Sequence, residues 1–582
     1  MAAPDRAGKL LLLLALLGVL GCHRSRDTRP SLVLILIDTL RADHLHSFGY
    51  PRETSPSLDL LAERGVVFDQ AISSAPWTLP SAMSVLTGRL PSSHGVENDG
   101  LKLAASVPTL AEVLRGAGYS TSAVVSHIYL DRPFGFDRGF DRFEDFGLGK
   151  EYRFEAGLEP RAERVTHRAI EEIRSLKGRP FFLLVHYFDP HWDYDPPPPF
   201  DTRFTGPYSG GITGKYESFS EYARPDRPLD PAGLQRLVDL YDGEIAYTDS
   251  QIGRLLEGLE REGVARNSVV AVLSDHGEEF KEHRSLGHGR NLYDEVIRVP
   301  LIVADLRTAG SGRRVTEQVR SIDLFPTLCA LAGVVAPRGI QGESLVPFLS
   351  GGTSAARGAV TETIRLDAYR KSLRTSGVKL IVSLENNGRE LYDLKADPAE
   401  QQDLWTKRGE EALTMEQELF RQVEVFAGGW NLRWSSDGTP HRFSGSIETE
   451  GLITGVAPLF PEVGRHRVIR GRRIDFDLEG VARGGGISFT LSPPESRVGF
   501  ALALDGRKET GKVFVGGTRL TPHVNPLGFA GPPSSELLSK PSFRSGEELG
   551  FFLWRSPGPS GEETSELTEA MKERLRSLGY LR

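Results

Sequence analysis

The chain has 582 residues, a formal net charge of −8 and a hydrophobic content of 39%. This length exceeds one ordinary domain, and we expect about two or three domains in a globular protein. The mildly acidic balance and the lack of a long basic run argue against a nucleic-acid partner.

The N-terminus has the pattern of an export signal. Arg6 and Lys9 precede an apolar run that is too short to cross a bilayer as a mature helix. The run ends in Val19-Leu20-Gly21-Cys22, which resembles a bacterial lipobox and implies cleavage before Cys22 and acylation of that residue. We therefore expect a signal peptide (1–21), a linker (22–30) and an exported lipoprotein anchored on the periplasmic or cell-surface face. An uncleaved signal anchor and a plain secretory peptide are the alternatives.

The chain has two cysteines, Cys22 and Cys329. If Cys22 is acylated, no disulfide can form within the chain. Cys329 lies in an apolar segment that ends at Gly333 and has the pattern of a core helix. We expect Cys329 to be a buried, inert thiol.

Residues 31–430 alternate apolar runs with helical patterns, which predicts an α/β domain. Residues 31–37 form a continuous apolar run, typical of a parallel strand buried on both faces. Between the helical stretches lies a segment (190–231) rich in Pro, Gly, Tyr and Asp, which we expect to loop over one end of the sheet. Further strands are expected at 120–126, 181–187, 268–274 and 299–304, and helices at 107–115 and 231–262.

The composition and the hydrophobic pattern of the sequence change near residue 434. Short alternating runs separated by Gly, Pro and Ser predict an antiparallel β-rich region over 434–558. It is either a separate domain or an extension of the preceding domain's sheet. Residues 562–582 form an amphipathic helix expected to dock on the body of the protein, with membrane contact as the alternative. The β runs are 473–479, 487–491, 498–504, 512–515 and 550–554, and the apolar face of the helix carries Leu567, Met571, Leu575 and Leu578.

Three polar residues directly follow expected strands. Asp38 ends the first strand, and Asp275 and His276 end the strand at 268–274. Ligands of open α/β sheets bind beyond the carboxyl ends of the strands, and a buried charge there needs a partner. Together with Thr78, at the expected N-terminus of a helix, these residues form a candidate metal site. Each residue alone could equally be a turn residue or a helix cap.

Several ordered motifs resemble the sulfatase family of the alkaline phosphatase superfamily. They are Ser-Ser-Ala-Pro-Trp-Thr-Leu-Pro-Ser-Ala-Met-Ser-Val-Leu-Thr-Gly-Arg (73–89), Pro-Ser-Ser-His-Gly (91–95) and Glu-Leu-Tyr-Asp-Leu-Lys-Ala-Asp-Pro (390–398). The resemblance covers about residues 31–405. It implies the family's mixed sheet flanked by helices, one divalent metal ion and covalent catalysis by the residue at position 78.

The chain also departs from the family pattern. Thr78 stands where sulfatases carry the Cys or Ser that becomes formylglycine, so no formylglycine is expected. Ala82 replaces an arginine, and residues 125–128 lack the lysine of the family's Gly-Lys-Trp-His stretch, His127 matching only with a one-residue shift. The pair Asp275-His276 replaces Asp-Asn. A Thr nucleophile with an Asp-His pair resembles phosphodiesterases, nucleotide pyrophosphatases and phosphoethanolamine transferases of the same superfamily.

The threonine favours phosphorus chemistry. A formylglycine hydrate expels sulfate by collapsing to the aldehyde, whereas a threonine ester has no such exit. A phosphothreonine can instead be resolved by metal-assisted attack of water or another alcohol. The imidazole of His276 favours zinc or manganese as the metal, with calcium or magnesium as further possibilities.

Four more residues are candidates for the site. His191 and His288 match positions that face the ester in the family, and either could protonate the leaving oxygen, a structural role being the alternative. Arg89 is a candidate substrate contact that could instead brace its helix. Asn98 is a candidate phosphate donor whose register among neighbouring glycines is open.

The leading hypothesis is a lipid-anchored, metal-dependent hydrolase that uses Thr78 on phosphate or phosphonate esters, as a phosphodiesterase or a phosphoryl transferase. A sulfuric ester hydrolase is the second hypothesis. The third is a catalytically silent, lipid-anchored protein that binds a glycan or another partner. The expected substrate is an anionic ester that is glycan- or lipid-linked. We expect residues 190–231 to select it, with the β-rich region as a further candidate. The sequence does not indicate the oligomeric state.

Overall fold

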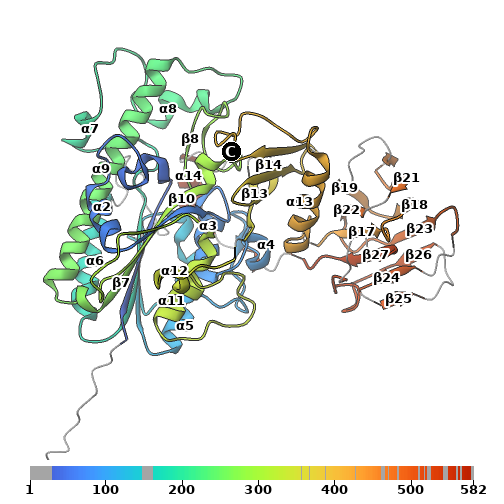
Figure 1. Cartoon of the computed structure of the whole chain (residues 1–582), viewed down its shortest axis with the longest axis horizontal. Coiled ribbons are helices and arrows are strands. Elements are labelled where there is room, and N and C mark those ends of the chain that lie inside the picture. The colour runs from blue at the N-terminus through green and yellow to red at the C-terminus, as the bar shows by residue number, and fades with distance from the viewer. Residues whose placement is uncertain are drawn as a thin grey trace, which may run out of the picture.

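The structure is a computed structural model with an α/β body and an all-β C-terminal region beside it (Figure 1). It describes residues 29–577 except 147–160, 356, 366–367, 387, 427, 460–465, 470, 482–483, 509–511, 517, 521–525, 542–547, 559–561 and 564–566. The expected signal peptide, Cys22 and Leu578 lie outside the described residues.

The body is built on a nine-stranded mixed sheet with the order β11-β2-β10-β7-β1-β6-β4-β5, in which β12 also pairs with β2. Its centre, β7-β1-β6-β4, is parallel, whereas β10 runs antiparallel to both β7 and β2. The predicted α/β fold with a mixed sheet is thus confirmed. The strands are β1 (Ser31–Ile37), β2 (Val66–Ile72), β4 (Ser120–Val124), β5 (Arg142–Glu144), β6 (Phe181–Tyr187), β7 (Ser268–Ser274), β10 (Arg298–Asp305), β11 (Arg313–Val315) and β12 (Val319–Arg320).

Helices cover both faces of this sheet, which explains why β1 is apolar at every position after Ser31. Leu32, Leu34 and Leu36 belong to one buried cluster, and the alternating residues of β1 belong to a second cluster on the opposite face. The first face carries α3 (Thr78–Thr87), α5 (Leu110–Gly116) and α11 (Leu324–Leu331). The second face carries α2 (Pro56–Arg64), α6 (Ala162–Leu176) and α9 (Pro231–Arg261).

Short elements connect these layers. The helical ones are η1 (Ala42–His44), η2 (His46–Phe48), α4 (Pro91–His94), η3 (Ile128–Leu130), η4 (Arg132–Phe134), α7 (Phe200–Arg203), α8 (Tyr216–Phe219), η5 (Ser220–Ala223), η6 (Ala265–Asn267), α10 (Asp294–Ile297), η7 (Ser321–Asp323) and α12 (Val346–Leu349). The short strands are β3 (Leu101–Lys102), β8 (Glu279–Phe280) and β9 (Leu286–Gly287).

A second, four-stranded antiparallel sheet lies beside the body (Figure 1). Its strands are β13 (Ala359–Arg365), β14 (Ala368–Arg374), β15 (Val378–Ser383) and β16 (Gly388–Asp393), and α13 (Gly409–Gln422) packs against it. β13 reaches back to the loop before α3, because the Thr361 hydroxyl donates to the Ser73 carbonyl at 2.7 Å. This sheet therefore brings residues far along the chain to the N-terminal end of α3.

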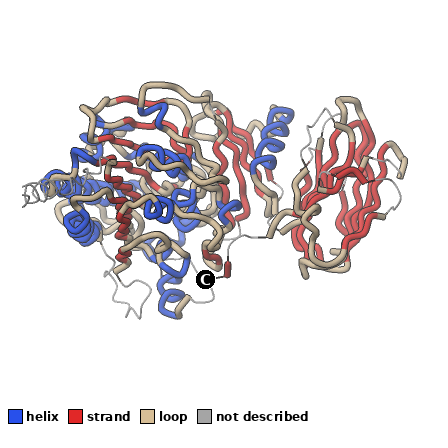
Figure 2. The backbone as a smooth tube through the Cα atoms, turned by 90° about the horizontal axis from the view of Figure 1, so that it is seen from below, coloured by secondary structure: helices blue, strands red, loops and turns tan. Residues whose placement is uncertain are grey.

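The C-terminal region contains two antiparallel-rich sheets, whose strands are seen in Figure 2. The two sheets share one apolar core. Their orders are β19-β22-β17-β27-β24-β25 and β20-β21-β18-β23-β26, and neither sheet shares hydrogen-bonded strands with β13–β16. The region begins at Trp430, four residues earlier than predicted. The strands are β17 (Trp430–Ser435), β18 (His441–Thr449), β19 (Leu452–Leu459), β20 (His466–Ile469), β21 (Arg473–Val481), β22 (Gly485–Ser492), β23 (Val498–Leu504), β24 (Val513–Val515), β25 (Thr518–Leu520), β26 (Leu527–Phe529) and β27 (Gly550–Arg555).

After the β-rich region the chain returns to the α/β body. β28 (Glu562–Glu563) pairs with β3, and α14 (Glu569–Ser577) follows. Met571 and Leu575 of α14 are buried in the cluster that also holds α3 and α5. None of the described helices has the length and apolar composition needed to cross a membrane.

Candidate active site

The candidate site lies at the carboxyl ends of β1, β6 and β7. Asp38 follows β1, and Asp275 and His276 follow β7, which pairs with β1 in the register Ile37 to Ser274. The Asp275 amide donates to the Ile37 carbonyl at 3.2 Å, which fixes the two strand ends side by side. Adjacent parallel strands thus place both carboxylates at one point, as predicted from the sequence.

The geometry of these residues fits a cation. Ligand atoms of Asp38, Asp275 and His276 lie within 4.8 Å of one another, and the three side chains are fully buried. Within the part of the chain that the structure describes, Oδ1 of Asp38 and Oδ2 of Asp275 accept no hydrogen bond. Nδ1 of His276 is 2.9 Å from the Gly277 carbonyl, and Nε2 lies 3.4 and 3.5 Å from those two carboxylate oxygens. Buried carboxylate oxygens with this arrangement suit a divalent metal ion.

The electrostatics of the protein alone disfavour charge at this point. Burial raises the pKa of Asp275 to about 8. Burial, and then the charges of Asp275 and Glu278, hold the pKa of Asp38 well above its ordinary value. Burial, and then the nearby His288, lowers the pKa of His276 well below its ordinary value. A bound cation would offset the cost of two ionised carboxylates. The types of ligand atom and the raised pKa values of the carboxylates therefore both fit a cation site.

Thr78 is the first residue of α3 and faces this group. Its Oγ1 lies 3.3 Å from Nε2 of His276 and 3.5 Å from Oδ2 of Asp38. The Ser81 hydroxyl, one turn further along α3, donates to the Asp275 carbonyl at 2.6 Å and so ties the helix to the end of β7. The hydroxyl of Thr78 is therefore held between the candidate metal ligands and the N-terminus of a buried helix.

The two histidines predicted as acids are also brought to the site. The rings of His288 and His276 lie 4.4 Å apart, and those of His288 and His191 lie 5.1 Å apart. Nδ1 of His288 is 2.9 Å from Oε1 of Glu278, whose other oxygen accepts a hydrogen bond from the Tyr194 hydroxyl at 2.9 Å. Burial lowers the pKa of both His191 and His288 well below the ordinary value.

The structure does not bring Arg89 and Asn98 into this group. Arg89 follows the C-terminus of α3, roughly 15 Å along the helix axis from Thr78. Its guanidinium lies against the segment around Gly339, which fits the bracing role rather than substrate contact. Oδ1 of Asn98 accepts from the Gly100 amide at 2.9 Å and thereby closes its own turn.

Two residues near the site, His186 and Trp192, were absent from the sequence analysis, and a third, His127, was noted there only as a shifted match to the family pattern. His186, on the strand next to β1, places Nε2 3.7 Å from Oδ2 of Asp38, and burial lowers its pKa to about 3. The ring of His127 lies 6.1 Å from that of His191. Trp192 stacks on His288 with ring centroids 4.7 Å apart. His186 could have been found, because its imidazole interrupts the apolar residues near the end of β6.

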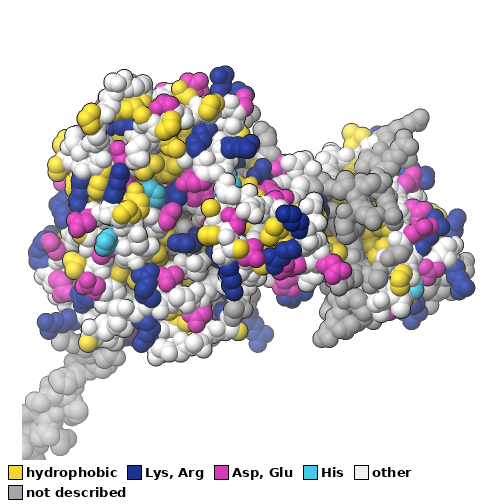
Figure 3. All heavy atoms as spheres, turned by 45° about the horizontal axis from the view of Figure 1, so that its top comes forward, with side chains coloured by type: hydrophobic (Ala, Val, Ile, Leu, Met, Phe, Trp, Pro, Cys, Tyr) yellow, Lys and Arg dark blue, Asp and Glu magenta, His cyan; other side chains and the backbone are white. Residues whose placement is uncertain are grey.

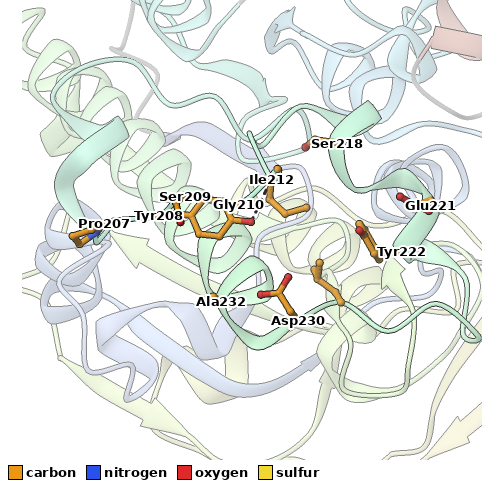
Figure 4. Close-up of a pocket in the computed structure, with 12 residues that line it drawn as sticks. Pro207, Tyr208, Ser209, Gly210, Ile212, Ser218, Glu221, Tyr222, Asp230 and Ala232 are labelled. Atoms are coloured by element: carbon orange, nitrogen blue, oxygen red, sulfur yellow. Dashed lines mark hydrogen bonds between the residues drawn. The ribbon is translucent and has the colours of Figure 1, made fainter.

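The segment between β6 and α9 covers the region beside the site. It contains an open hollow of about 530 Å³ lined by polar groups, in which the Tyr208 hydroxyl accepts from the Ile212 amide at 3.2 Å (Figure 4). None of the residues lining this hollow is a candidate catalytic residue. The hollow and the catalytic group are thus separate features, linked through a segment that also carries Trp192.

Comparison with known proteins defines the family. Residues 30–334, more than half of the chain, match the family described as Sulfatase, and residues 282–425 match the description N-sulphoglucosamine sulphohydrolase, C-terminal. The chain therefore belongs to the sulfatase family of the alkaline phosphatase superfamily, and it is a hydrolase of that family. The two matches together end at the start of the C-terminal β-rich region.

Relatives of the chain include both sulfatases and a phosphonate hydrolase. The N-acetylglucosamine-6-O-sulfatase of Bacteroides thetaiotaomicron is 24% identical over 505 residues, covering 71% of this chain and 90% of its own. The arylsulfatase of Clostridium perfringens is 25% identical over 432 residues, covering 64% and 89%. The phosphonate monoester hydrolase of Agrobacterium radiobacter shares the fold, with a TM-score of 0.57 and 23% identity over 68% of this chain and 95% of its own.

Proposed function

We propose that this protein is a metal-dependent hydrolase of phosphate- or phosphonate-type esters with Thr78 as its nucleophile. The observation that carries the proposal is the position of the Thr78 hydroxyl, 3.3 Å from Nε2 of His276 and 3.5 Å from Oδ2 of Asp38. A threonine oxygen next to a buried Asp-Asp-His group has the geometry of an activated nucleophile.

Asp38, Asp275 and His276 would hold the metal ion, with Thr78 as a fourth ligand. The ion would supply Lewis acidity that lowers the pKa of the Thr78 hydroxyl and offsets charge on an ester oxygen. The nitrogen donor of His276 favours zinc or manganese over calcium or magnesium. Because the carboxylates resist ionisation in the protein alone, metal affinity should increase as the pH rises.

The proposed reaction has two steps. The hydroxyl proton of Thr78 leaves along the hydrogen bond to Asp38, and Oγ1 forms a bond to phosphorus while the bond to the leaving oxygen breaks. The first amides of α3 face the negative oxygens of the transferred group. Water, or an acceptor alcohol in a transferase, then attacks phosphorus and gives a proton to the group that protonated the leaving oxygen, while the bond to Oγ1 breaks and Thr78 takes its proton back from Asp38.

The leaving oxygen needs a proton in the first step. His288 would donate it through Nε2. Burial holds the pKa of Glu278 well above its ordinary value, so a protonated Glu278 donates to Nδ1 and the proton of the neutral imidazole lies on Nε2; Glu278 then supplies Nδ1 with a proton as Nε2 gives up its own. His191 is the second candidate, with its Nδ1 at 2.7 Å from the Trp192 carbonyl. The Tyr194–Glu278–His288 chain fixes the orientation of one imidazole, which favours His288 as the acid.

A sulfuric ester hydrolase is the second candidate function, because relatives at about one-quarter identity are named sulfatases. Thr78 argues against this function, because a sulfate ester of threonine cannot expel sulfate by forming an aldehyde. We also propose that the substrate is glycan- or lipid-linked and that residues 190–231 select it, because Trp192 of this segment stacks on His288. Export as a lipoprotein acylated at Cys22 rests on the sequence alone, and mass spectrometry of the mature N-terminus would test it.

The direct experiment compares aryl esters under matched conditions. Nitrophenyl phosphate, bis-nitrophenyl phosphate, a nitrophenyl phosphonate and nitrophenyl sulfate are each assayed with zinc, manganese and calcium. We expect turnover of a phosphorus ester to exceed that of the sulfate, and Thr78→Ala to reduce it by about 10³-fold or more. Thr87→Ala, at the other end of the same helix, is the matched control. Faster sulfate turnover that also requires Thr78 would favour the second candidate, and activity that survives Thr78→Ala would refute both.

A further inference from the structure

The N-terminal end of α3 is approached by a strand from the second sheet. β13 is fixed to the loop before Thr78 by the Glu362 amide, which donates to the Ser74 carbonyl at 3.0 Å. On the other side, the Thr363 hydroxyl donates to the Gly289 carbonyl, next to His288, at 2.8 Å. The end of β13 therefore lies between the nucleophile loop and the His288 loop.

Arg365 is the last residue of this strand, and it is only 8% exposed. Its guanidinium carbon lies 4.0 Å from the centroid of the Trp77 ring, and Trp77 directly precedes Thr78. Its Nη2 also donates to the Tyr129 hydroxyl at 3.4 Å. A Cβ atom added at Gly289 would come within 3.1 Å of Cδ of Arg365, so the side chain passes directly over the His288 loop.

The charge of Arg365 acts on the catalytic group. It contributes to the low pKa values of His276, His288 and His191, although burial is the larger cause for each. The position of the guanidinium is given by its contacts: it lies over Trp77, next to Thr78, and the side chain passes the loop that carries His288. Its stacking on Trp77 fixes the planar fork instead of leaving it to move in solvent.

The arginine and the lysine that grip the anion in sulfatases have no counterparts at positions 82 and 125–128. The structure shows Ala82 fully buried in the apolar cluster around α3, where it presents no charge. A site with two metal-binding carboxylates still needs positive charge for the non-bridging oxygens of an anionic ester. Arg365 supplies a bidentate donor at the N-terminal end of α3.

We infer that Arg365 is the anion-binding residue of this site and contacts the non-bridging oxygens of the tetrahedral group that Thr78 attacks. The inference rests on the proposed function and extends it to a specific substrate contact from the second sheet. It also favours esters whose transferred group carries two charged oxygens, since a planar fork binds such a pair.

The test uses the full chain loaded with metal and inorganic phosphate as the probe. Isothermal titration calorimetry should show that Arg365→Gln weakens phosphate binding by about 10- to 100-fold. The phosphate affinity of Arg365→Lys should lie between those of Arg365→Gln and the unmodified protein, and the metal content of both variants should be unchanged. Arg370→Gln is the matched control, because Arg370 lies on the neighbouring strand and pairs with Glu385. In Arg365→Ala, added guanidinium ion should restore part of the phosphate affinity, which a merely structural role would not allow.

The outcomes separate this inference from the proposed function. If Arg365→Gln and Arg365→Ala are folded and bind phosphate as tightly as the unmodified protein, the inference is wrong, whatever Thr78→Ala does to turnover. If phosphate binding depends on Arg365 but no ester is turned over, the anion-binding role of Arg365 stands and the proposed function fails. If Arg365→Gln does not fold, Arg365→Lys provides the test. A bidentate contact would be contradicted if Arg365→Lys bound phosphate as tightly as the unmodified protein and changed KM and kcat more for the diester than for the monoester.

Discussion

Oγ1 of Thr78 lies 3.3 Å from Nε2 of His276, although 198 positions separate the two residues in the chain. The contact exists because β7 pairs with β1 and because Ser81 ties α3 to the end of β7. The proposed nucleophile and the candidate metal ligands are therefore fixed by the central sheet.

Loss of a metal-binding carboxylate should reduce metal affinity before it affects folding. We expect Asp275→Asn to weaken zinc or manganese binding by at least about 100-fold, because a charged ligand is lost from a fully buried group. Metal content after dialysis against a chelator measures the effect. Asp305→Asn, whose carboxylate pairs with Arg307 at the surface, is the control. Equal metal retention in both variants would exclude Asp275 as a ligand.

The proposed acid should matter most for esters with poor leaving groups. His288→Gln should slow an alkyl ester by about 10²- to 10⁴-fold and a nitrophenyl ester much less, because nitrophenolate leaves without a proton. Glu278→Gln should give a smaller loss, since Glu278 orients the imidazole through its 2.9 Å contact with Nδ1. Leaving-group series for both variants provide the measurement.

The same series with His191→Gln decides between the two candidate acids. If His191→Gln steepens the leaving-group dependence and His288→Gln does not, the roles are exchanged. The exposed His167 provides a His→Gln control that should leave every rate unchanged.

Acidification should destabilise the fold through His94. Its Nδ1 accepts from the Val96 amide at 3.1 Å, and Nε2 lies 3.0 Å from the Ser84 hydroxyl. Burial lowers the pKa of His94 from 6.5 to about 3. Between these values the unfolded chain binds a proton that the folded protein does not, so the free energy of unfolding falls by up to about 1.4 kcal/mol per pH unit as the pH decreases.

The measurement is the unfolding midpoint between pH 4 and pH 7 for the unmodified protein and for His94→Gln. The variant should lose stability at neutral pH but show a shallower decline on acidification. His186, also buried with a pKa lowered to about 3, contributes a slope of the same sign that the variant retains. An identical slope in both proteins would contradict the assignment to His94.

The terminal helix should contribute to the stability of the α/β body. Leu575 is fully buried in the cluster of α3 and α5, so Leu575→Ala should cost about 2–4 kcal/mol, seen as a lower thermal midpoint. Leu452→Ala, at a half-exposed position of β19, should have little effect. An unchanged midpoint together with weakened binding to lipid vesicles would favour the membrane role instead.

Much of the α/β body and half of the candidate site could be predicted from short sequence patterns. Continuous apolar runs marked β1, β6 and β7, and polar residues directly after such runs marked Asp38, Asp275 and His276. The direction of the strands could not be predicted in this way. β10 is as apolar as its neighbours β7 and β2, but it is antiparallel to both of them. Apolar content reports burial on both faces and does not report direction.

The rest of the site depends on contacts that no local pattern contains. Arg365 ends a strand with alternating polar residues, and only its pairing with the loops around Ser74 and Gly289 places it beside Trp77. Trp192 lies in a segment whose composition indicates a loop but not what the loop touches. The first strands of the C-terminal region, β17 to β20, were not recognised from hydrophobicity. β17, for example, is buried along its whole length although it contains Asn431, Arg433 and Ser435.

The account depends on a covalent bond between Thr78 and the transferred group. Rapid acid quenching of the metal-loaded protein with a phosphorus ester, followed by peptide mass spectrometry, tests it directly. A phosphoryl or phosphonyl group on the peptide carrying Thr78, formed and lost at rates compatible with turnover, is the predicted result. Two results would contradict it. One is normal turnover with the phosphoryl or phosphonyl group on another residue; the other is the absence of any labelled peptide together with an unchanged rate in Thr78→Ala.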